Sequence, residues 1–75
     1  MDIGAGMIIN VDKSDITKKV VGMEKYLAIV AIENAGFIAR IIAEDGQYFI
    51  VTRDIKKDRI NLDIVDGKVF EAKRG

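Results

Sequence analysis

The longest apolar run of the chain lies in its first half. Seven consecutive apolar residues span Tyr26 to Ile32, inside a stretch of good helix formers that runs from Met23 to Ala35. Gly36 follows, and glycine often ends helices because it adopts the left-handed conformation without steric cost. The pattern therefore predicts a helix from about Met23 to Ala35.

After this helix the pattern changes to that of β-strands. Residues 37–43 are rich in apolar and β-branched side chains, and the turn signal Glu44-Asp45-Gly46 follows them. Residues 59–65 alternate between polar and apolar side chains, which predicts a strand with one buried face. That face consists of Ile60, Leu62 and Ile64.

Asp66-Gly67 is the strongest hairpin signal in the chain, and it leads into a further strand at residues 68–73. The order helix, strand, long loop, strand and hairpin strand describes an α+β domain. We expect one helix packed on a small mixed β-sheet. A long exposed loop over residues 46–58 should separate two parallel strands.

We divide the chain into an N-terminal extension, residues 1–20, and a domain, residues 21–75. Met7 to Val11 is a short apolar run typical of an added strand, and Ser14 is a suitable N-cap for a short turn that ends at Val20. The start carries an acid where a signal peptide needs a basic segment. We expect either that the mature form begins here or that the protein stays in the cytoplasm.

Composition excludes several classes of function. The chain has 75 residues, which suits one domain with a single core. It contains no Cys and no His, which argues against disulfide scaffolds, ordinary metal or haem sites, and Ser–His or Cys–His catalysis. Basic and acidic residues number 12 each, so no net charge draws the chain to a nucleic-acid polymer or a membrane. We expect no enzymatic activity and no cofactor.

The loop itself carries the candidate chemistry. Arg53 stands between Thr52 and Asp54, and Asp58-Arg59 opens the strand that follows. If both flanking side chains bond a second arginine from behind, the loop stays stiff while it offers one side chain to a partner. Such a loop loses little entropy on docking and binds tightly, as in a substrate-like protease inhibitor. The alternative interpretation is that Arg53 is an ordinary solvated residue of the loop.

A series of short motifs follows the same order as in a known family. In chain order these are Val21-Gly22 before the helix, Ile41-Ile42 at the end of the first strand, Val51-Thr52-Arg53-Asp54 in the loop, Asp58-Arg59 before the next strand, and Gly75. With these motifs, residues 21–75 resemble the potato inhibitor I family, the eglin-like serine protease inhibitors and their bacterial relatives.

The resemblance implies a role for each residue of the inhibitory loop. Arg53 would enter the specificity pocket of a protease, with the Arg53–Asp54 peptide bond at the cleavage position. Thr52 and Asp54 would turn back to hydrogen-bond Arg59, whose planar fork supports the loop. A basic residue here suits a pocket with a buried acid, as in trypsin-like enzymes. The implied contact with the protease is about 1,600 Å².

The sequence departs from the family pattern in two places. Many relatives carry a second arginine two residues after the first supporting one, and this chain has Asn61 there. Lys73 or Arg74 could substitute for it. The segment from Gly46 to Thr52 is also one residue longer than usual and contains two aromatic residues. Both departures predict a softer loop.

The apolar helix indicates an alternative class of function. A helix on one small sheet buries about half of its circumference, so a stripe with Leu27 and Ala31 would stay exposed unless another chain covers it. We therefore expect a homo-oligomer. In this alternative the protein is a small binding module of phage or bacterial type that sequesters a nucleotide or other anionic ligand between subunits. Its contacts with the ligand would come from Arg53, Lys56, Lys57 and Arg59.

Overall fold

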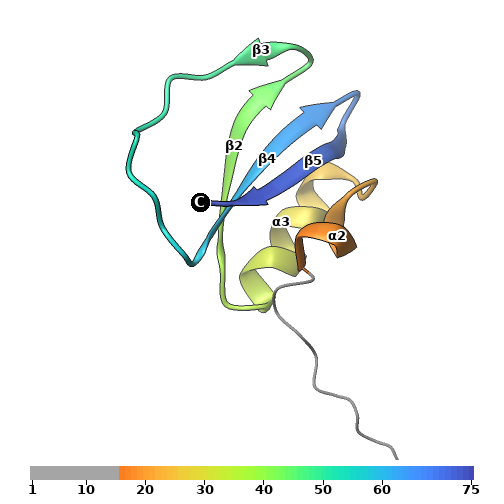
Figure 1. Cartoon of the computed structure of the whole chain (residues 1–75). Helices are drawn as coiled ribbons and strands as arrows, with labels where there is room; N and C mark the ends of the chain where they lie inside the picture. The colour runs from red at the N-terminus through yellow and green to blue at the C-terminus, as the bar shows by residue number, and fades with distance from the viewer. Residues whose placement is uncertain (1–15) are drawn as a thin grey trace, which may run out of the picture.

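A computed structural model describes residues 16–75, in which two helices pack on a four-stranded mixed sheet (Figure 1). The elements are α2 (Ile16–Val20), α3 (Lys25–Asn34), β2 (Ile38–Glu44), β3 (Gln47–Tyr48), β4 (Arg59–Val65) and β5 (Lys68–Arg74), and the order across the sheet is β3-β2-β4-β5. The predicted α+β class is confirmed. The predicted strand at Met7 to Val11 and the N-cap Ser14 lie outside the described residues.

Helix α3 begins two residues later than the sequence predicts. Glu24 is extended, with φ −61° and ψ 142°, and its side chain accepts a hydrogen bond of 3.2 Å from the Leu27 amide, so it caps the helix. Met23 and Gly22 instead pair with Val69 of β5 through main-chain bonds of 2.9 and 2.8 Å. The backbone before the helix therefore extends the sheet.

The central strands β2 and β4 are parallel neighbours, and β5 pairs with β4 in the antiparallel sense. Ile60, Leu62 and Ile64 are fully buried on the helix side of β4, as their alternation predicts. The turn between β4 and β5 is Asp66-Gly67, with φ of 54° and 77°. Two positive φ values are typical of the tight hairpin turn that an Asp-Gly pair predicts.

The observed loop begins later in the chain than the sequence predicts. Gln47 and Tyr48 form β3, which pairs antiparallel with the end of β2 across the turn Asp45-Gly46. The Phe49 amide extends this hairpin with a bond of 2.9 Å to the Ile42 carbonyl. The irregular loop therefore covers residues 49–58.

Helix α2 packs into the same core as the sheet. Ile16 and Val20 are buried beside Ile32 of α3, although the sequence places α2 in the N-terminal extension. On the outer side of α3, Leu27 is exposed as predicted, whereas Ala31 packs against the core and is not part of the exposed stripe. Within residues 16–75, no helix has the length and apolar character needed to cross a membrane.

A supported loop as the candidate functional site

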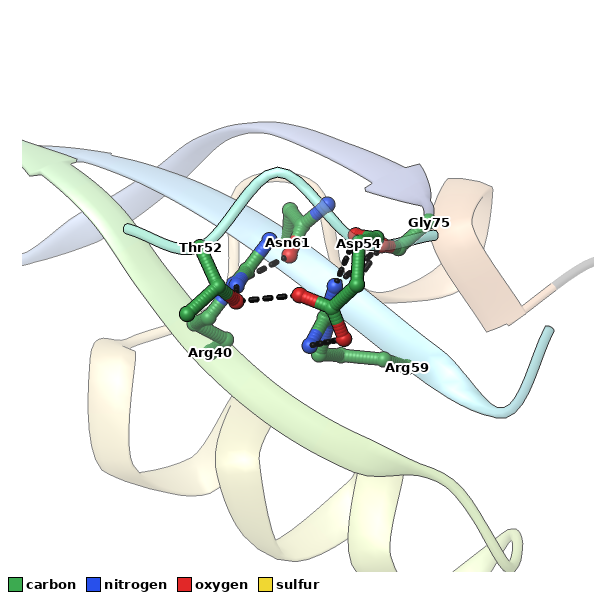
Figure 2. Close-up of polar contacts among 6 residues, drawn as sticks. All are labelled: Arg40, Thr52, Asp54, Arg59, Asn61 and Gly75. Atoms are coloured by element: carbon green, nitrogen blue, oxygen red, sulfur yellow. Dashed lines mark hydrogen bonds and ion pairs between the residues drawn. The ribbon is translucent and has the colours of Figure 1, made fainter. Parts of the chain in front are cut away.

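The loop at residues 49–58 leaves the β3 edge and crosses to the start of β4 on the side of the sheet away from the helices (Figures 1 and 2). The alternation of inward and outward side chains along β4 explains this arrangement. Ile60 and Leu62 point to the helices, so Arg59 and Asn61 point to the loop. Along the loop Ile50 and Ile55 are almost fully exposed, at 103% and 85%.

Arg59 lies beneath the loop and contacts it at Asp54, which is one of the two contacts expected of it. The residue is buried, and its side chain is 8% exposed. Its Nη2 donates to the main-chain oxygens of Asp54 at 2.7 Å and of Gly75 at 2.8 Å, and its Nη1 lies 3.5 Å from the Asp54 carboxylate (Figure 2). The Nε also donates to Gly75, at 3.2 Å. A planar guanidinium can serve all these acceptors at once, which lysine cannot.

Thr52 and Asp54 also bond each other across the intervening residue. The Thr52 hydroxyl donates to the Asp54 carboxylate. This bond, followed by the nearby charge of Arg59, holds the pKa of Asp54 below its usual value. At neutral pH the Asp54 side chain is therefore an ionised carboxylate that accepts from Thr52 and lies beside Arg59. Arg53 lies between Thr52 and Asp54 in the chain.

Thr52 is held by Arg40, not by Arg59 as expected. Arg40 lies on β2, beside Asn61 in the register of the parallel pair. Its Nη1 donates to the Thr52 hydroxyl oxygen at 3.2 Å, and its Nε donates to the Asn61 side-chain oxygen at 2.9 Å (Figure 2). Sequence reasoning missed this residue. The available signal was a single charge within the apolar strand at residues 37–43.

The residues expected to substitute for an arginine at position 61 have other contacts. Lys73 lies 3.5 Å from the Glu71 carboxylate. Arg74 donates to the Lys57 carbonyl through Nε and Nη2, at 3.1 and 2.9 Å, and its guanidinium lies 5.1 Å from the centre of the Phe37 ring. Arg74 therefore holds the end of the loop, and Arg40 holds the part near Thr52.

Arg53 is exposed, and so are Lys56 and Lys57. Arg59, the fourth residue of the predicted anion contacts, is instead turned toward Asp54 and Gly75. A shallow hollow lies beside the end of the loop, lined by Ile55, Lys56, Lys57, Arg74 and Gly75. In the described part of the chain, no group of three acidic side chains is placed to hold a metal ion.

The arrangement can present one basic side chain on a backbone that is fixed from the protein side. No protein-family model, curated protein or solved structure matches the chain. The geometry of the loop is therefore the basis for a proposal about function.

Proposed function

We propose that this protein is a substrate-like inhibitor of a trypsin-like serine protease, and that Arg53 enters the specificity pocket of the enzyme. The observation that supports the proposal is the pair of contacts on either side of Arg53. Thr52 and Asp54 turn inward to Arg40 and Arg59, whereas Arg53 between them is exposed. In this proposal the chain is a divergent relative of the potato inhibitor I family.

Preorganisation gives the proposal its energetic basis. Each side chain that has to be immobilised on binding costs about 0.5–1.5 kcal/mol, and a loop already held by its scaffold avoids much of that cost. Ile50 and Ile55 extend the exposed surface on both sides of Arg53 and supply apolar contact area for the protease. A guanidinium suits a pocket that ends in a buried carboxylate.

The experiment is an inhibition assay against trypsin and a chymotrypsin-like enzyme. We expect the wild-type protein to inhibit trypsin with a constant on the order of nanomolar to micromolar. Arg53→Ala should weaken that inhibition by about 100-fold or more, because the pocket loses its charged occupant. Arg53→Leu should transfer inhibition to the chymotrypsin-like enzyme, whose pocket is apolar.

The matched control is Lys68→Ala, which removes an exposed basic residue from β5 at the far end of the strand from Arg74. It should leave inhibition of trypsin unchanged. If the wild-type protein inhibits no member of a panel of serine proteases, the proposal is contradicted. Rapid and complete cleavage after Arg53 would also contradict it, since the chain would then be a substrate.

The exposed face of α3 favours a second candidate function, an oligomeric module that binds a nucleotide or other anion. Tyr26, Leu27 and Val30 are exposed on this face, and the hollow beside the loop is lined by the cations Lys56 and Lys57. This candidate predicts an oligomer whose melting temperature rises when nucleotides are added. The inhibitor proposal predicts no such rise.

A further inference from the structure

The two sides of the Arg53–Asp54 bond are held by different arginines from different strands. Arg59, on β4, contacts Asp54, the residue after the bond. Arg40, on β2, contacts Thr52, two residues before the bond. Within residues 16–75, the main chain of residues 50–55 takes part in one described hydrogen bond, at the Asp54 carbonyl. The side before the bond therefore depends on side-chain contacts.

Asn61 completes the support of Thr52. Its side-chain oxygen accepts from the Arg40 Nε, so Arg40 is fixed at one donor while another donor reaches Thr52. Arg40 and Asn61 are direct neighbours across the parallel pair. A neutral acceptor at position 61 suits the cation beside it, whereas a second cation there would repel Arg40. The two positions therefore form one unit that offers a single guanidinium to Thr52.

We propose that Arg40, positioned by Asn61, anchors the acyl side of the loop and thereby decides whether a bound protease reseals or hydrolyses the Arg53–Asp54 bond. This inference rests on the proposed function. Arg40 is a positioning residue, since it acts through Thr52 and touches no reacting atom. Asn61 is part of the same device, because without its acceptor the Arg40 side chain loses the contact that orients it.

The reaction shows why the acyl side matters. The serine oxygen of the protease attacks the carbonyl carbon of Arg53, the bond to the Asp54 nitrogen breaks, and that nitrogen takes the serine's proton through the protease's base. Arg53 is then an ester of the protease. Water can hydrolyse the ester: its oxygen becomes part of the Arg53 carboxylate, one of its protons restores the serine hydroxyl, and the other is released to solvent. Alternatively, the Asp54 amine attacks the ester, the peptide bond reforms and the serine regains its proton.

The outcome depends on how well the amine and the ester are held together. Two groups held in reacting geometry behave as if present at a very high local concentration, which favours resealing over attack by water. Arg59 holds the amine side through two contacts with Asp54. Arg40 holds the ester side through Thr52. The Thr52–Asp54 hydrogen bond also joins the two sides, so the loss of either arginine contact loosens the two groups while the ester exists.

The test uses Arg40→Met, which keeps much of the side-chain length and removes the donors. Wild-type and variant proteins are incubated with catalytic trypsin, starting from intact chain and from chain nicked at Arg53–Asp54, and the intact fraction is measured by mass spectrometry. A charge-assisted hydrogen bond corresponds to about a 10- to 100-fold effect. We expect Arg40→Met to raise the cleavage rate, and lower the intact-to-nicked ratio, by about that factor.

Three further variants distinguish a specific role of Arg40 from a general loss of structure. Lys18→Met removes an exposed cation from α2, away from the loop, and should leave both readouts unchanged. The double variant Arg40→Met/Asn61→Arg moves the guanidinium to the neighbouring strand. It should restore the intact-to-nicked ratio to within a few-fold of the wild-type value. Asn61→Arg alone should lower the ratio, because it places a second cation beside Arg40. A merely structural role for Arg40 would not give this rescue.

A measurement without protease distinguishes failure of this inference from failure of the proposed function. Backbone order parameters report nanosecond motion of each amide. In Arg40→Met they should fall at residues 51–53 and stay unchanged at residues 56–58, near the Arg74 contact. Unchanged order at 51–53, or an unchanged intact-to-nicked ratio in a folded variant, would overturn the inference. If the wild-type protein inhibits no protease, the proposed function and the resealing role fail, and the order parameters still decide the anchoring.

Discussion

Asp54 is the residue at which the polar contacts of the loop converge. Its carboxylate accepts from Thr52 and lies near the Arg59 guanidinium, and its carbonyl accepts from the same guanidinium. Both carboxylate contacts favour the ionised form, which is why the pKa of Asp54 lies below its ordinary value of 3.8. Folding is therefore linked to the ionisation of this side chain.

The linkage gives a pH dependence with a definite sign. Because the pKa of Asp54 is lower in the folded protein, its contribution to stability is complete above the ordinary pKa and is lost as the pH falls through the folded-state pKa. The free energy of unfolding of wild type minus that of Asp54→Asn should be constant above about pH 5 and should shrink below about pH 4. Urea denaturation at a series of pH values measures this difference.

Glu33→Gln controls for the general effect of removing a carboxylate, since Glu33 is exposed on α3, on the other side of the sheet from the loop. If the difference in free energy of unfolding between wild type and Asp54→Asn stays constant down to about pH 2, Asp54 has no stabilising contacts in its ionised form.

The contrast between Arg59 and Arg40 shows what sequence reasoning can predict at the residue scale. Arg59 is found in the sequence because it lies in the loop motif itself and opens a clearly periodic strand. Arg40 is separated from Thr52 by 12 positions, and its contact depends on the register that places it beside Asn61. Register is set by packing across strands, so one sequence does not reveal which strand supplies the second arginine.

At the scale of elements, period and turn chemistry predict most of the sheet. Strand β4 has the predicted bounds because polar and apolar residues alternate along its whole length, and Asp66-Gly67 specifies the hairpin that follows. The sequence does not predict β3, because two residues are too few to show a period. It predicts the start of α3 two residues too early, because Met23 and Glu24 are compatible with a helix but pair with β5.

Substitution of Leu62 tests the role of β4, the strand that joins the loop to the core. Leu62 is fully buried in the middle of β4, next to Ile41 of β2 and Ala72 of β5 in the register of the sheet. Leu62→Ala should lower the free energy of unfolding by about 2–5 kcal/mol, from the lost apolar burial and the cavity that remains. Thermal or urea denaturation measures the loss.

Val65→Ala is the matched control in the same strand, because Val65 is 43% exposed at the end of β4. It should cost less than about 1 kcal/mol. Equal effects of the two variants would show that the inward face of β4 does not form the centre of the core.

At the scale of the whole molecule, the two sides of the sheet have different surfaces. One side carries the loop and its polar contacts, with Arg40, Asn61 and Arg59 beneath it. The other side is covered by the helices, and Tyr26, Leu27 and Val30 of α3 are exposed. An apolar helix face of this kind is typical of a surface that contacts another chain.

Self-association through α3 is therefore our prediction for the protein in solution. Light scattering should give a mass that is a multiple of the 8.3 kDa chain. Leu27→Glu should reduce the mass to that of one chain, because a charge cannot be buried in an apolar contact without a partner.

Phe70→Glu changes an exposed apolar residue on β5 instead and should leave the mass unchanged. A wild-type mass of 8.3 kDa at every concentration would remove α3 as an interface. The loop at residues 49–58 lies on the other side of the sheet, so under the proposed function the Leu27→Glu variant should still inhibit trypsin.

The parallel pairing of β2 with β4 has one further consequence. The Arg53–Asp54 bond lies in the connection between them, so a cut there yields one fragment with both helices, β2 and β3, and a second fragment with β4 and β5. The buried face of β4 packs against Ile16, Val20 and Ile32, which belong to the first fragment. Hydrophobic burial shared across the cut would keep the fragments together as a noncovalent pair. A cut in this exposed connection would thus leave the packed interior of residues 16–75 in place.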